Sequence, residues 1–147
     1  MDASAHTHPP RWYWIAAGLI LAWMLVGVAA WLADLMMDEA AFAELSDAQR
    51  SLYERRPGWL FRVYGVAVIA GLAGALGMLL RRDWAVLALG LSLAAVVIQM
   101  GYTFTAMDAI GALGAAAALP FPLLILGIGA ASLWLSLHAR RRDWLRR

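Results

Sequence analysis

Four long apolar runs, separated by short polar segments, constrain this chain more than any other feature of its sequence. Each run has about 20 residues, the length that crosses ~30 Å of hydrocarbon as an α-helix. Apolar residues make up 63% of the 147 residues and charged residues only 15%, whereas soluble domains have about 45–50% and 25%. We therefore expect an all-α integral membrane four-helix bundle, a single domain over residues 1–147 with spans at about residues 12–33, 59–80, 84–104 and 119–138.

The second run, Arg55–Arg82, has a glycine-rich half and is expected to lie at the centre of the bundle. Lipid provides no hydrophobic drive between helices, so close backbone approach at small residues is a main source of their association. We predict that the other spans pack around the second one. The small residues of this run share one broad helical face, which consists of Ala67, Ala70, Gly71, Gly74 and Gly77.

Residues 34–57 form the one sizeable polar segment between spans, and most of its charges are acidic. The segment is predicted to form one bent helix or two short amphipathic helices, lying on the membrane surface or against the bundle. Asp38 can cap the first helix. Ser46 and Gln49, three residues apart, have the form of a capping box for the second.

The third span places small and polar residues on one face, including Ser92, Gln99 and Thr103. This face is expected to look into the bundle, while the opposite face, with Val86 and Leu89, is expected to contact lipid. The Gln99 amide needs hydrogen-bond partners inside the membrane. Two interpretations stay open: a hydrogen bond to another helix, or a polar group that binds a substrate.

The fourth span is preceded by an alanine- and glycine-rich stretch, Asp108–Leu119, which is helical by composition and can begin the span early. Pro120 and Pro122 each lack a backbone donor, so we expect a kink or a fresh helix start there. Gly127 and Ala131 have the four-residue spacing of a small-residue packing contact.

Arg62 lies one turn inside the second span and is the most unusual ionisable group of the chain. An arginine near a span end can extend its guanidinium to the headgroups. The alternative is an ion pair with Asp34 or Asp108, because both aspartates follow spans at the same predicted face of the membrane.

The charges also predict the orientation in the membrane. The two termini and the Arg81–Arg82 turn hold eight arginines and three acidic residues, whereas residues 34–62 with Asp108 hold four and seven. Because basic residues concentrate in cytoplasmic segments, we predict that both termini are cytoplasmic and that the acidic segment lies outside.

Several kinds of chemistry lack the residues they need. The chain has no cysteine, which excludes disulfides and thiol-ligated metals. The spans carry no mid-membrane carboxylate and no histidine except His138 at one edge, so haem ligation and proton-coupled transport lack their groups. Ser92 has no base beside it, and the histidines of the polar tail, His6 and His8, rarely make a defined metal site. We expect no catalytic residue, metal, cofactor or nucleic-acid partner.

Four stretches of the sequence resemble a family of small four-span membrane proteins of proteobacteria, whose members are often labelled "sugar transporter". The stretches are RPGW at Arg56–Trp59, GLAGALG at Gly71–Gly77, SLAAVVIQMGYT at Ser92–Thr103 and HARRRDWL at His138–Leu145. The resemblance implies a multi-pass protein of the bacterial inner membrane. It assigns no function to any residue.

Two functions are consistent with this sequence. The first is a non-catalytic protein that acts through helix–helix contacts, as an accessory or assembly subunit of a membrane complex or as a small homo-oligomer. The second is a carrier for a small, sugar-like solute that works as a dimer, with a weak polar lining from Ser92, Gln99, Tyr102 and Thr103 and with Arg62 near its mouth.

Overall fold

A computed structural model describes residues 8–146, so most of the polar N-terminal tail, with His6, lies outside the described residues. The described chain is all-α, and four of its helices are long and apolar enough to cross a membrane, which confirms the predicted fold class. The long helices differ from the expected spans by only a few residues: α1 (Arg11–Leu35), α4 (Gly58–Leu79), α5 (Trp84–Thr105) and α8 (Pro120–Arg141).

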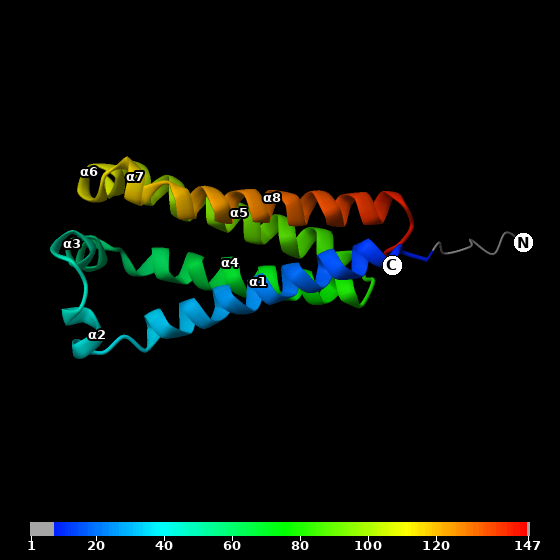
Figure 1. Cartoon of the computed structure of the whole chain (residues 1–147), viewed down its shortest axis with the longest axis horizontal. Helices are drawn as coiled ribbons and strands as arrows, with labels where there is room; N and C mark the ends of the chain where they lie inside the picture. The colour runs from blue at the N-terminus through cyan, green and yellow to red at the C-terminus, as the bar shows by residue number, and fades with distance from the viewer. Residues whose placement is uncertain (1–7, 147) are drawn as a thin grey trace, which may run out of the picture.

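The long helices pack in the order of the sequence, α1 against α4, α4 against α5 and α5 against α8 (Figure 1). Half of the apolar stretch of α4 is buried inside the protein, compared with 11% in α1 and in α8. The start of α1, the α4–α5 turn and the end of α8 lie together at what we name the terminal end. The opposite end, with the short helices, is the loop end.

The glycines of α4 lie at its interfaces with α1 and α5. A Cβ added at Gly71 would lie 2.6 Å from the Met24 sulfur, and one at Gly74 would lie 2.5 Å from Leu89 Cγ. A Cβ at Gly77 would lie 2.9 Å from the Cβ of Ala85. Each distance is shorter than carbon contacts allow, so these three positions let the helices approach more closely than any side chain would permit.

The acidic segment forms two short helices, α2 (Glu39–Ala43) and α3 (Asp47–Arg55). The Asp38 carboxylate accepts a hydrogen bond from the Ala41 N–H at 2.8 Å, and Ser46 and Gln49 make a capping box. Both predicted caps are thus confirmed. They satisfy backbone donors that have no partner within a helix.

The stretch before the fourth span forms α6 (Ala109–Leu113) and α7 (Ala115–Ala118), separated by Gly114 with φ +80°. α8 then begins at Pro120, which confirms a fresh helix start at the prolines. Proline suits the first turn of a helix because its missing N–H is not needed there.

The predicted lipid face of the third span is partly wrong. Val86 and Leu89 are buried, as are Ala85 and Ser92 on the predicted inner face. The reason is that α5 lies between α4 and α8 and is therefore covered on two sides. Residues between these two contact surfaces, such as Leu87 and Ile98, are exposed instead.

Candidate functional site

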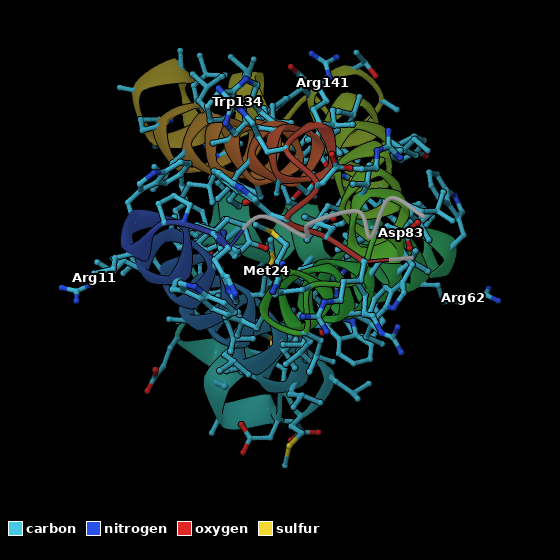
Figure 2. All side chains as sticks on the ribbon, turned by 90° about the vertical axis from the view of Figure 1, so that its right-hand side faces the viewer. Arg11, Met24, Arg62, Asp83, Trp134 and Arg141 are labelled. Carbon is cyan, nitrogen blue, oxygen red and sulfur yellow. The ribbon has the colours of Figure 1, made fainter. Side chains whose placement is uncertain are left out.

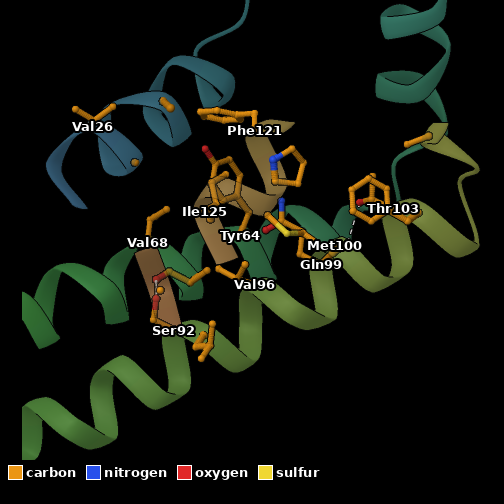
Figure 3. Close-up of a pocket in the computed structure, with 18 of the residues that line it drawn as sticks. Val26, Tyr64, Val68, Ser92, Val96, Gln99, Met100, Thr103, Phe121 and Ile125 are labelled. Atoms are coloured by element: carbon orange, nitrogen blue, oxygen red, sulfur yellow. Dashed lines mark hydrogen bonds between the residues drawn. The ribbon is translucent and has the colours of Figure 1, made fainter. Parts of the chain in front are cut away.

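A cavity of about 450 Å³ lies among the four long helices, in the half of the protein nearer the loop end. α4 and α5 form one wall, and α1 and α8 form the other (Figure 3). The short helices cover it at the loop end, where Leu52 of α3, Leu113 of α6 and Ala118 of α7 contribute apolar side chains. Its size falls in the range of about 300–1,000 Å³ that is typical of ligand pockets.

The cavity exists because α1 and α8 do not pack against each other along their lengths. α1 rests on α4 and α8 rests on α5, which leaves space between the outer helices. The lining residues of α1 include Gly27, which is too small to fill that space, whereas Gly129 of α8 lies against Leu93 of α5. Trp23 of α1 and Phe121 of α8 approach across it, with ring centroids 6.5 Å apart.

Two hydroxyl groups of the lining are occupied by helix backbone. The Ser92 hydroxyl donates to the Ala67 carbonyl at 2.6 Å, which ties α5 to α4. The Thr103 hydroxyl donates to the Gln99 carbonyl one turn earlier at 2.8 Å. Neither group therefore has its hydrogen free for a ligand.

Unlike the Ser92 and Thr103 hydroxyls, the Gln99 amide and the Tyr64 hydroxyl are not bonded to helix backbone. Both residues line the cavity, and Figure 3 shows their side chains directed into the same space from α5 and α4. Within residues 8–146, neither side chain has a hydrogen-bond partner. Unpaired polar groups are costly in an apolar environment, so these two groups form the chemically distinctive part of the cavity.

The terminal end of the bundle is closed by polar and aromatic contacts. The buried Tyr13 hydroxyl donates to the Met78 carbonyl at 2.8 Å, joining α1 to α4. The segment after α8 folds back, so that Arg81 Nε donates to the Trp144 carbonyl at 2.7 Å and Asp83 N–H donates to the Arg146 carbonyl at 2.9 Å. The cavity is thus sealed from this end.

Trp144 is the centre of that closure. Its ring is 9% exposed and lies edge-on to the rings of Trp12, Tyr13 and His138, with centroids 5.5–5.7 Å apart. Sequence reasoning missed this role. The signal was present in the apolar pair Trp144-Leu145 within an otherwise arginine-rich tail.

Of the two interpretations of Arg62, the ion pair is not made within the described chain, where Asp34 pairs with Arg56 instead. Arg56 Nη1 lies 2.6 Å from the Asp34 carboxylate, and its guanidinium lies 4.5 Å from the Tyr53 ring centroid. Asp108 caps α6 by accepting from the Gly111 N–H at 3.1 Å. Arg62 lies one position past Phe61, the residue that stacks on Trp31 of α1, so it points away from the bundle (Figure 2).

We expect the pair of Asp34 and Arg56 to contribute measurably to stability. The Asp34 and Arg56 side chains are 16% and 23% exposed, so the pair is intermediate between a surface and a buried ion pair. A surface pair stabilises a protein by about 0–1 kcal/mol, and disruption of a buried pair costs about 3–5 kcal/mol. A double-mutant cycle of Asp34→Ala and Arg56→Ala, measured by unfolding in detergent, should give a coupling energy of about 2 kcal/mol. Arg62→Ala is the matched control and should show no coupling to Asp34→Ala or to Arg56→Ala. Strictly additive effects of Asp34→Ala and Arg56→Ala would refute the ion pair.

The predicted contact of Gly127 and Ala131 is not made within the described chain. Both residues are exposed, and a Cβ added at Gly127 would meet no described atom within 4 Å. The reason is that α8 turns Ser132, Leu135 and Ser136 toward its neighbours, which places Gly127 on its outer side.

Comparisons with protein-family models, curated proteins and solved structures find no match for this chain. The structure and the sequence together indicate a four-span helical membrane protein with an apolar cavity, into which Tyr64 and Gln99 direct polar groups that have no partner among the described residues.

Proposed function

We propose that this chain is a non-catalytic membrane protein that binds a small, uncharged molecule in the cavity between its four long helices. The observation that carries the proposal is the pairing of a ligand-sized space with the free Gln99 amide and Tyr64 hydroxyl. Few polar groups that converge in a mostly apolar pocket are typical of small-molecule sites. Of the two functions expected from sequence, this favours the carrier over the accessory subunit.

Glycine substitutions on α1 test the proposal. Gly27 lines the cavity, and an added Cβ would lie 3.6 Å from Val68, an ordinary contact, so Gly27→Leu should obstruct the cavity and leave the fold intact. Gly18→Leu is the matched control, because a Cβ there meets no atom of the described residues within 4 Å. Native mass spectrometry after purification in mild detergent should find a bound molecule on wild type and Gly18→Leu but not on Gly27→Leu. Identical spectra for all three proteins would refute the proposal.

The accessory-subunit function remains a second candidate, supported by the exposed Gly127 and Ala131 on α8. Small residues with four-residue spacing suit close contact with another transmembrane helix. Co-purification in mild detergent distinguishes the two candidates, because a stoichiometric partner protein lost on Gly127→Ile would support a subunit of a larger complex or a homo-oligomer.

We further propose a bacterial inner-membrane location with both termini in the cytoplasm. The proposal rests on the excess of arginine at the terminal end and of acidic residues at the loop end. A reporter fused after Arg147 should be active on the cytoplasmic side, and one inserted beside Glu44 should be active outside. The opposite pair of signals would overturn this orientation.

A further inference from the structure

We infer that the occupant of the cavity is an uncharged, lipid-like molecule with one small polar head, which enters from the bilayer between α1 and α8. This inference rests on the proposed function and names its ligand class. It follows from the charge of the lining, from the number of free polar groups and from the side on which the cavity is least closed.

The lining excludes a charged ligand. Among the lining residues, all within the described part of the chain, none carries a charge. A charged group moved into such an apolar space without a counter-charge loses its hydration at a large cost in free energy. The occupant is therefore neutral.

The number of free polar groups argues against a sugar. A monosaccharide carries several hydroxyl groups, and each one buried without a partner costs free energy. Three lining side chains have a polar group without a protein partner in residues 8–146: Trp23, which can only donate through its indole N–H, and Tyr64 and Gln99, which lie opposite each other. Tyr64 and Gln99 can serve one carbonyl or hydroxyl head, because the amide both donates and accepts and the phenol does too.

The rise of an α-helix indicates how deep the polar head and the hydrocarbon part of the ligand lie in the cavity. Tyr64 lies six residues after the start of α4, and Gln99 lies six residues before the end of α5, so both are about 9 Å from the loop end at 1.5 Å per residue. Ser92 at the far side of the cavity is seven residues deeper than Gln99, a further ~10 Å. The walls along this depth include Met24, Val68 and Val96. A head at Gln99 thus has an apolar channel below it for the first part of a hydrocarbon chain, and the rest of a longer chain extends between α1 and α8 toward the bilayer.

The contacts that close the cavity at its two ends and at the α4–α5 interface leave the α1–α8 side as the entry route. Apolar side chains of α3, α6 and α7 cover the loop end, and the Tyr13–Met78 and Arg81–Trp144 hydrogen bonds close the terminal end. α4 and α5 pack tightly through Gly74. Between α1 and α8, the ring contact of Trp23 with Phe121 spans the cavity. Parting this contact opens the cavity to the lipid without disturbing the α4–α5 interface.

Photolabelling in reconstituted phosphatidylcholine bilayers tests the ligand class. The probe is hexadecanol with a diazirine in its chain, and the matched probe is hexadecanoic acid with the same diazirine. Hexadecanol should label Met24 and Val68 in wild type and in Gly18→Leu but not in Gly27→Leu. Gln99→Leu and Tyr64→Phe should each weaken competition by unlabelled hexadecanol about two- to tenfold, the worth of one neutral hydrogen bond.

Three results would overturn the ligand class: equal labelling of the cavity by the acid, labelling confined to lipid-facing residues such as Leu87 and Ile98, or displacement of the probe by glucose. If mass spectrometry finds a polar molecule that Gly27→Leu displaces, the ligand class is wrong while the proposed function stands. If Gly27→Leu displaces no bound molecule of any kind, both the ligand class and the proposed function are wrong.

A separate cross-linking experiment tests the entry route. Because the chain has no cysteine, a thiol reagent would react only with introduced cysteines. Trp23→Cys with Phe121→Cys is joined by a short, reducible bifunctional thiol reagent before the hexadecanol probe is added. Labelling of Val68 should then be slow, and reduction of the cross-link should restore its rate. An unchanged rate across the cross-linked and reduced proteins would place the entrance elsewhere.

Discussion

Gly74→Ile should abolish the folded bundle or destabilise it by at least about 3 kcal/mol, the upper end of overpacking costs. A Cβ at this position would lie 2.5 Å from Leu89 Cγ and 3.1 Å from the Leu89 backbone nitrogen. Rotation of the Leu89 side chain relieves the first contact but not the second, so α4 and α5 have to separate. The measurement is the yield of monodisperse protein in detergent, together with its thermal unfolding.

Gly101→Ile on α5 is the control for Gly74→Ile. It introduces the same side chain into a long helix, but a Cβ at Gly101 meets no atom within 4 Å in the part of the chain that the structure describes. Its unfolding temperature should stay close to that of wild type. If the two variants purify and unfold alike, the close approach at Gly74 does not hold the bundle together.

Trp144→Ala should lower the free energy of unfolding by about 3–5 kcal/mol, the usual cost of deleting a buried tryptophan side chain. The ring is 9% exposed and lies against three other aromatic rings from α1 and α8. Its loss also loosens the segment whose carbonyl accepts the Arg81 hydrogen bond. Denaturant unfolding in detergent micelles, followed by tryptophan fluorescence, measures the change.

Trp134→Ala is the matched control for Trp144→Ala. Trp134 is 62% exposed and stacks on His138 with ring centroids 5.4 Å apart. Its loss should cost only about 0.5–1.5 kcal/mol, the worth of one aromatic pair. Equal losses for the two variants would show that Trp144 does not close the terminal end.

The sequence predicted what depends on short stretches of chain. The span lengths follow from apolar runs, the helix starts at Ser46 and Pro120 follow from local hydrogen bonds and from the proline ring, and the glycine face of α4 follows from three-residue spacing. Each of these features is decided by residues within a few turns of one another. That is why composition and periodicity were sufficient for the fold class.

Features that depend on which helices are neighbours were missed. The periodicity of α5 gave it one inner face, whereas packing on both α4 and α8 buries Leu89 as well as Ser92. The sequence left two alternatives open for Arg62, a contact with the lipid headgroups or an ion pair, and it did not indicate that Asp34 pairs with Arg56. The cavity beside Tyr64 arises because α1 and α8 lie apart over most of their length and approach each other through side chains such as Trp23 and Phe121. Residue patterns within one stretch of sequence cannot predict the space between α1 and α8, because it depends on how helices far apart in sequence are arranged.

The closure at Trp144 also has a consequence for the order of folding. The long helices contact mainly their neighbours in sequence, and such local contacts form early because they enclose short loops. The hydrogen bond of Arg81 with Trp144 instead joins residues 63 positions apart, from the α4–α5 turn to the segment after α8. It should therefore form after the rate-limiting step. Trp144→Ala should then accelerate unfolding while leaving the folding rate almost unchanged, so that the tail sets the lifetime of the native bundle rather than the speed at which it is reached.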